Sequence, residues 1–286
     1  MVQDEQEVRL ADSIAFVSRK IAQTRCRKIS ETLFRYYPAK KGSTTIRDFD
    51  GDLAISLDRS SYITSAIYWA GHHSLHAVRF LREYLRPEMT LVDIGANIGE
   101  ITLLAAKRLG RGQVLAFEPL PHVYERLCQN VALNQFGNVK TFNMGLYQES
   151  GSLPLFVKND KPYGVTNEGV TSLFHAGDDR QEAVVPLRKL DDVAVECGLA
   201  RLDVMKIDVE GAEWMVLRGG EESIKKFRPV IIVEISESNF KRAGYTGKDM
   251  VAYLRGLEYD VRSLEDGGEV LSAECDALCF PRERKR

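Results

Sequence analysis

The feature that most constrains the fold is the segment Val92–Gly99, which reads Val-Asp-Ile-Gly-Ala-Asn-Ile-Gly. Its apolar start predicts the end of a buried strand, and residues 98–109 have the spacing of a helix. Glycines at such a junction let the backbone turn without a Cβ clash and approach a ligand closely. The segment therefore predicts a strand–loop–helix unit with a ligand-binding loop.

Short apolar runs alternate with helical patterns along the rest of the chain from Thr90 onward. The predicted strands are Leu91–Ile94, Val114–Phe117, Val139–Phe142, Leu202–Ile207, Val230–Val233, Tyr259–Ser263 and Ala277–Phe280. Strands that alternate with helices are typical of a parallel, doubly wound sheet. We therefore expect an α/β fold.

Residues 1–86 have a different pattern and predict a helical and hairpin extension ahead of a domain that covers residues 87–286. A helix is predicted from about Glu5 to Tyr37, a hairpin turn at Asp50-Gly51, and two helices separated by Gly71. Within the domain, residues 151–187 break into short β-like pieces. We expect this stretch to be an insert on the substrate side.

The charge balance excludes a strongly basic nucleic-acid binder or an acidic cation buffer, since 39 Lys+Arg face 41 Asp+Glu. Between Arg19 and Lys41, however, eight basic residues face one acid, which indicates a solvated helix face or, alternatively, a surface for an anionic partner or membrane. The acidic start is unlike a signal peptide, and no apolar run approaches the ~20 residues of a membrane span. Five scattered cysteines predict free thiols in a reducing compartment, so we expect a cytoplasmic protein.

A carboxylate at the end of the next strand accompanies the glycine loop. Glu118 follows Asp93 by 25 residues, the place where an acid hydrogen-bonds a ribose diol. The Gly95-x-x-x-Gly99 spacing differs from a dinucleotide fingerprint, and Glu100 at the helix start would repel a pyrophosphate. These features favour a nucleoside without phosphate that carries a sulfonium and an amino-acid tail, as in S-adenosylmethionine. The alternative is a tight turn with an exposed glutamate.

A second acidic segment follows the strand that ends at Ile207. Asp208 and Glu210 are expected at the carboxyl edge of the sheet, where ligands bind in doubly wound folds. Asp208 could instead cap a helix, and Glu213 could be a first-turn acid. Glu234 predicts a further acidic strand end.

The chain resembles the FkbM-type S-adenosylmethionine-dependent methyltransferases from about Asp50 to Leu264. The resemblance rests on the glycine loop, Ala116–Pro119, Asn130–Asn134, Leu187–Asp191, Lys206–Glu213, Val216–Gly219, Val233-Glu234 and the lead-in segment around Tyr62 and Ile67–Gly71. It implies a seven-stranded class I methyltransferase fold that transfers methyl to a hydroxyl oxygen of a glycan or small-molecule metabolite.

The resemblance also implies roles for individual residues. The methionine part of the cofactor would be held by Asp93, Gly95, Asn97 and Gly99. Glu118 would hold the ribose, and Asn143 would lie near the adenine. A hydroxyl acceptor benefits from a general base, for which Asp208 is the first candidate, then Glu210 and His72. We find no convincing metal constellation in the sequence, although Asp208 with Glu234 or His72 could bind a metal if the fold brought them together.

Three other classes of protein share features with the chain. The Tyr36-x-x-x-Lys40 string is typical of a short-chain dehydrogenase, but in that class it follows the glycine loop, and here it precedes the loop. Pro38 would also break the helix that must carry the pair. A nucleic-acid or protein methyltransferase is suggested by the basic stretch and the basic tail, although no Asn-Pro-Pro-Tyr-type motif is present. A scaffold that binds the nucleoside but has lost catalysis is the third.

Overall fold

The computed structural model describes residues 2–22, 42–58, 61–157, 171–175, 177, 179–270 and 274–284. The chain divides into two compact units, with the boundary between Leu75 and His76. The described residues of the first unit are those up to Leu75. Those of the second begin at His76.

The first unit consists of a helix, a hairpin and a second helix: α1 (Val2–Ala22), β1 (Ser43–Phe49), β2 (Leu53–Asp58) and α3 (Tyr62–Ala70). The predicted Asp50-Gly51 turn is confirmed: both residues have positive φ, 45° and 99°, and join the antiparallel strands β1 and β2. Gly71 ends α3 as expected, with φ 86°.

Part of the predicted N-terminal helix and most of the basic stretch, residues 23–41, lie outside the described residues. Arg19 belongs to that stretch but is not solvated, since it is 4% exposed. Its guanidinium forms an ion pair with Asp48 at 2.8 Å and donates to the carbonyl of Tyr68 at 2.7 Å. At Arg19, the prediction of a solvated basic face is wrong.

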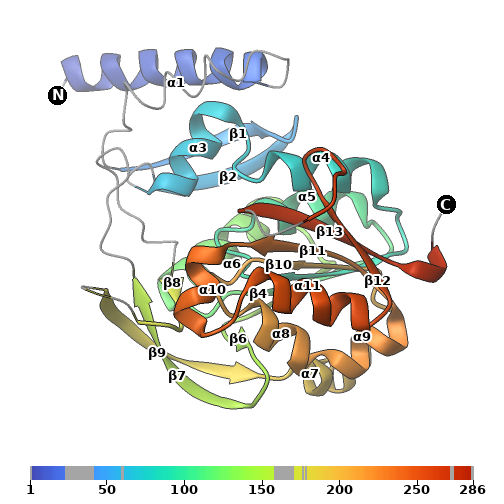
Figure 1. Cartoon of the computed structure of the whole chain (residues 1–286). Coiled ribbons are helices and arrows are strands. Elements are labelled where there is room, and N and C mark those ends of the chain that lie inside the picture. Colours follow the sequence, from blue (N-terminus) through green and yellow to red (C-terminus); the bar gives the residue numbers. More distant parts are fainter. Residues whose placement is uncertain are drawn as a thin grey trace. The chain divides into compact units, whose positions relative to one another are not determined.

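The second unit is built on a seven-stranded sheet in the order β12-β13-β11-β10-β3-β4-β5 (Figure 1). The strands are β3 (Thr90–Ile94), β4 (Gln113–Phe117), β5 (Val139–Phe142), β10 (Val204–Ile207), β11 (Val230–Ile235), β12 (Tyr259–Ser263) and β13 (Cys275–Pro281). Five neighbouring strands are parallel, and β13 runs antiparallel to β11 and β12. The predicted α/β fold with a mostly parallel sheet is confirmed.

Helices cover both faces of this sheet because the strand residues alternate between two buried clusters. One face packs against α7 (Leu190–Glu196), α8 (Glu213–Gly219), α9 (Glu221–Phe227), α10 (Glu237–Ala243) and α11 (Gly247–Gly256). The other packs against α4 (Leu75–Tyr84), α5 (Glu100–Arg108) and α6 (Pro121–Leu133). The described part of the chain ends in a short 3-10 helix, η2 (Arg282–Arg284). No described helix combines the length and the apolar character that crossing a membrane requires.

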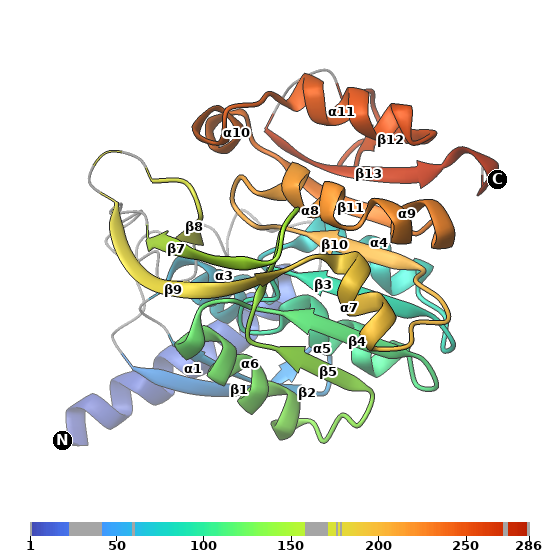
Figure 2. The ribbon, with the colours of Figure 1, turned by 90° about the horizontal axis from the view of Figure 1, so that it is seen from below.

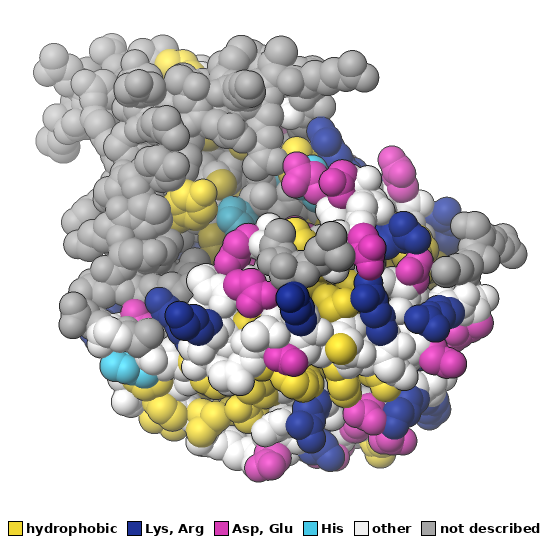
Figure 3. Space-filling model, viewed as in Figure 1, with side chains coloured by type: hydrophobic (Ala, Val, Ile, Leu, Met, Phe, Trp, Pro, Cys, Tyr) yellow, Lys and Arg dark blue, Asp and Glu magenta, His cyan; other side chains and the backbone are white. Residues whose placement is uncertain are grey.

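A separate four-stranded sheet, β6-β9-β7-β8, contains the predicted insert. Its strands are β6 (Gly145–Leu146), β7 (Gly151–Val157), β8 (Thr171–Ser172) and β9 (Arg180–Arg188), and Figure 2 shows β7 and β9 as a long curved pair. Residues 158–170, 176 and 178 of the insert lie outside the described residues. Hydrophobic side chains gather over β7 and β9 in Figure 3, and Leu153 and Val184 are 36% and 62% exposed.

Two predicted strand ends differ in the structure. β11 continues through Glu234 to Ile235, so Glu234 lies within the strand, opposite Asp276 of β13. β10 starts at Val204 rather than Leu202, and Asp203 directly ahead of it accepts a hydrogen bond from the Thr90 backbone N–H with its carboxylate at 2.9 Å. Cys275 and Cys279 share one strand as expected, and the described cysteines are all free.

Candidate active site

The glycine loop joins β3 to α5 at the carboxyl edge of the sheet. Gly95 and Ala96 donate their N–H groups to the Phe117 carbonyl at 3.0 and 2.9 Å, which ties the loop to the end of β4. Gly95 has φ +76°, and a Cβ there would lie 1.9 Å from the backbone oxygen of Asp208. Asn97 and Gly99 also have positive φ, 50° and 99°. The loop therefore has a backbone that only glycine and asparagine adopt readily.

Asp93 lies beneath this loop rather than in it. Its side chain is fully buried, and one carboxylate oxygen, Oδ2, accepts from the Thr102 hydroxyl at 2.6 Å. The other oxygen, Oδ1, is buried with no hydrogen-bond partner among the described residues. Desolvation raises the pKa of Asp93, and the Lys206 ammonium opposes that shift. Asp93 therefore supports the loop from below.

Glu118 connects the end of β4 to the loop. Its carboxylate oxygens accept from the backbone N–H groups of Asn97 and Leu120, both at 2.9 Å. Burial raises the pKa of Glu118 to about 7, although these two hydrogen bonds lower it. The Asn143 side chain donates to the carbonyls of Glu118 and Pro119, both at 3.0 Å. The structure thus brings together the predicted residues Asn97, Glu118 and Asn143.

A buried lysine faces the loop from the next strand. Lys206 of β10 is 8% exposed, and its ammonium donates to Asp208 Oδ2 at 3.0 Å and to the Gly95 carbonyl at 3.4 Å. Burial lowers the pKa of Lys206, but the carboxylates of Asp208 and Asp93 raise it more, so the ammonium stays charged. We did not identify this residue from the sequence, although a lysine among buried strand residues was a usable signal.

Three carboxylates converge next to Lys206. One oxygen each of Asp208, Glu210 and Glu234 lie within 4.8 Å of one another. Desolvation, and then the charges of Asp208 and Glu210, raise the pKa of Glu234 to about 9. Hard oxygen ligands of this kind suit a divalent cation, so the three residues could hold one. The structure brings together Asp208 and Glu234, which the sequence left open as a metal pair, and adds Glu210.

Glu210 is held in a strained conformation by two neighbouring elements. Its φ is +53°, which is uncommon outside glycine and asparagine. The Asn239 side chain of α10 donates to Glu210 Oε2 at 2.8 Å, and the Ser172 hydroxyl of β8 donates to the Glu210 carbonyl at 2.7 Å. Strain that surrounding contacts maintain is typical of functional sites.

Glu213 organises the same loop from inside the protein. It is fully buried and accepts hydrogen bonds from the N–H groups of Val209 and Gly211 and from the Tyr245 hydroxyl, at 3.0–3.3 Å. Burial raises the pKa of Glu213 to about 7. Glu213 begins α8 as a first-turn acid, as one interpretation of the sequence held, but its carboxylate also fixes the loop that carries Asp208 and Glu210.

His72, the third candidate base, belongs to the first unit. It is 2% exposed and packs against Phe49 with ring centroids 5.1 Å apart. Within its own unit it is a buried histidine, and its role as a base stays a prediction.

Comparison with known proteins identifies the family. Residues 93–261, more than half of the chain, match the model of the methyltransferase FkbM domain. The chain belongs to the FkbM methyltransferase family. The strand order, with one antiparallel strand beside the parallel ones, is that of the class I Rossmann-like methyltransferases, as the resemblance implied.

Three curated methyltransferases show the extent of the similarity. Methyltransferase sdnD of Sordaria araneosa is 34% identical over 171 residues, which cover 51% of this chain and 66% of that protein. Hexuronic acid methyltransferase AglP of Haloferax volcanii is 28% identical and covers 62% of this chain and 66% of its own length. The 31-O-demethyl-FK506 methyltransferase FkbM of Streptomyces tacrolimicus is 27% identical, and the match covers 64% of this chain and 76% of that protein. This chain thus matches just under two thirds of the length of the first relative, methyltransferase sdnD.

Proposed function

We propose that this FkbM family member uses S-adenosylmethionine to methylate a hydroxyl oxygen of a glycan or small-molecule metabolite. The observation that carries the proposal is the meeting of a glycine loop, an acid-terminated strand and a carboxylate cluster at one sheet edge. Two of the curated relatives support the acceptor class through their names, which refer to a hexuronic acid and to an O-demethyl substrate.

The residues present fit S-adenosylmethionine. Gly95 lets the loop pack directly against the backbone of Asp208, so the glycine loop and the end of β10 lie together at the edge where a nucleoside binds in this fold class. Each Glu118 oxygen accepts one backbone hydrogen bond and retains a lone pair for a ribose hydroxyl. The carboxylates of Asp208 and Glu210 next to the loop give the site negative charge, which suits a sulfonium cation.

The cofactor supplies, when bound, an electrophilic methyl group. Asp208 takes the proton of the acceptor hydroxyl, because its carboxylate lies at the strand end and is held in place by the Lys206 ammonium. Glu210 and Glu234 border the same space, and Glu234, with a pKa of about 9, holds a proton at neutral pH and can donate a hydrogen bond. Holding the reactants in line can itself supply ~7–11 kcal/mol of barrier reduction.

The role of Asp208 is tested with radiolabelled cofactor and a panel of uronic acids, oligosaccharides and polyketide alcohols. We expect methyl transfer to at least one acceptor class, and an Asp208→Asn variant that binds the cofactor normally but transfers about 10²–10⁴-fold more slowly. Glu265→Gln, which removes an exposed carboxylate outside the site, is the control. Unchanged transfer by Asp208→Asn would rule out this base. The cytoplasmic location stays a prediction.

A further inference from the structure

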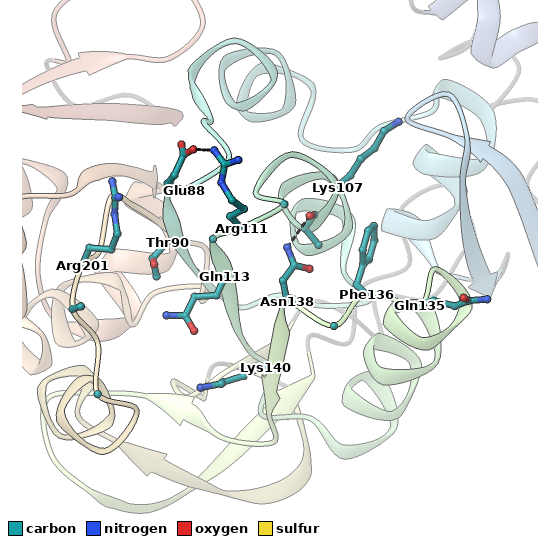
Figure 4. A pocket seen from close by; sticks show the side chains of 16 residues that line it. Glu88, Thr90, Lys107, Arg111, Gln113, Gln135, Phe136, Asn138, Lys140 and Arg201 are labelled. Carbon is teal, nitrogen blue, oxygen red and sulfur yellow. Dashed lines mark hydrogen bonds and ion pairs between the residues drawn. The ribbon is translucent and has the colours of Figure 1, made fainter.

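A pocket of about 840 Å³ lies at the opposite, amino-terminal edge of the same sheet (Figure 4). It is bordered by the first residues of β3 and β4, by β5, and by the loop that leads into β10. Its volume is within the range of ~300–1,000 Å³ that small-molecule sites occupy. Because the glycine loop and the carboxylates lie at the carboxyl edge, this pocket is separate from the candidate active site.

Polar side chains from neighbouring strands face this pocket. In the strand register Thr90 pairs with Gln113 and Leu115 with Lys140, so Thr90, Gln113 and Lys140 share one face of the sheet. Figure 4 shows Gln113 and Lys140 pointing to the same side. Within the described part of the chain, neither of these two side chains has a hydrogen-bond or ion-pair partner. A charged ammonium and an amide donor are therefore available to a ligand.

Two arginines on the rim are held by carboxylates. Arg201 donates to both oxygens of Asp203 at 2.7 Å, and Asp203 also accepts from the Thr90 backbone. Arg111 pairs with Glu88, as Figure 4 shows. These pairs fix the rim and balance the charge of both arginines, so the excess positive charge of the lining comes from Lys107 and Lys140. Figure 4 shows Lys107 directed away from Lys140, so Lys140 is the cation beside Gln113 and favours an anion there.

Glycines keep the rim open. A Cβ at Gly137 or at Gly198 would meet nothing within 4 Å, so the space beside both residues is open. Gly137 lacks a positive φ, which means that the backbone does not require glycine there. A larger side chain at this place would reduce the opening of the pocket.

We propose that this pocket binds a small molecule through an oxyanion group, a phosphate or a carboxylate, held by Lys140 and Gln113. An ammonium acts as a point charge for such groups, and the adjacent amide N–H adds a directional hydrogen bond. The inference is independent of the proposed methyl transfer, since no residue of the candidate active site takes part.

The test is calorimetric titration of the full chain with pyrophosphate and, separately, with citrate. We expect binding of at least one probe that weakens about tenfold in Lys140→Gln and further in Gln113→Glu, which adds a repelling carboxylate. Lys248→Gln, which removes another exposed lysine without a partner among the described residues, should leave binding unchanged. Melting temperatures of the variants report whether they are folded.

The outcomes separate the two ligand sources and the competing explanations. Tighter pyrophosphate binding identifies phosphate as the group, and tighter citrate binding identifies carboxylate. Saturating S-adenosylhomocysteine should not displace either probe, because the active site lies at the other edge. Absence of binding of both probes, displacement by S-adenosylhomocysteine, or equal loss in Lys140→Gln and Lys248→Gln would each overturn the proposal.

Discussion

Buried glutamates give the candidate active site an unusual proton balance. Burial raises the pKa of Glu118 and Glu213 to about 7 and that of Glu234 to about 9, from an ordinary value of 4.5. The folded state therefore holds more protons than the unfolded state between about pH 4.5 and 9. A group of this kind stabilises the fold fully below its unfolded pKa and loses that stabilisation as the pH rises through its folded pKa.

The first prediction follows from the upward direction of these pKa shifts. The free energy of unfolding should fall as the pH rises from 5 to 9, by at most about 1.4 kcal/mol per pH unit for each ionising glutamate. Glu234→Gln imitates the protonated form and should flatten the profile between pH 7 and 9. Urea denaturation at intervals of pH measures both profiles. Parallel profiles for the two proteins would show that Glu234 is already ionised in the fold.

The second prediction concerns the buried Lys206–Asp208 pair. Lys206→Met leaves the Asp208 and Asp93 carboxylates without their cation, and removing one partner of a buried pair costs about 3–5 kcal/mol. Lys225→Met breaks an exposed pair with Glu221 and should cost far less, because solvent screens that pair. Chemical denaturation compares the two. Equal small losses would mean that Lys206 does not compensate these carboxylates.

At the scale of elements, the carboxyl edge is held together by loops that touch through their backbones. Gly95 approaches the end of β10 so closely that an alanine Cβ would overlap the Asp208 oxygen. The third prediction is that Gly95→Ala both destabilises the protein and displaces Asp208. Gly244→Ala, with a similar φ of +83° and open space around it, isolates the strain of the backbone alone, about 1–2 kcal/mol. A larger loss of stability and of cofactor affinity in Gly95→Ala is the expected difference, and calorimetry measures both.

Contacts from α10 and β8 position Glu210, which leads to the fourth prediction. Asn239→Ala removes the hydrogen bond to the Glu210 carboxylate. Methyl transfer should then slow about tenfold, which corresponds to an activation barrier about 1.4 kcal/mol higher. The Kd of the cofactor should stay unchanged. Asn134→Ala, which removes a hydrogen bond at the end of α6, is the control. A rise in cofactor Kd without a fall in kcat would contradict the positioning role.

The sequence predicted the elements of the sheet well because their signals are local. Alternating apolar runs located the strands, and the Asp50-Gly51 dipeptide located the hairpin. Long-range interactions were not visible: the sequence does not show that Asp203 bonds to Thr90 at the start of β3, or that Glu234 pairs with Asp276 of β13 and so lies within β11. In the site, Lys206 and the roles of Asn239 and Ser172 depend on contacts between distant segments, which a single sequence does not show.

At the scale of the whole molecule, we propose that the domain boundary lies ahead of α4 rather than after residue 86. Ala77, Val78 and Leu81 of α4 are buried in the same cluster as Leu91 of β3. The fifth prediction is that residues 76–286 fold on their own, whereas residues 87–286 do not, since each lost core side chain costs about 2–5 kcal/mol. Circular dichroism and thermal melting distinguish the two chains. Cooperative melting of the shorter chain would place the boundary after α4.

The central claim is that the glycine loop and Glu118 form an S-adenosylmethionine site. The most direct test is calorimetric titration of the purified chain with S-adenosylmethionine and with NAD, each repeated on Glu118→Ala. The account predicts micromolar binding of S-adenosylmethionine alone, and a loss of that binding in Glu118→Ala while the variant still melts cooperatively. Binding of NAD instead, or of neither ligand, would contradict it.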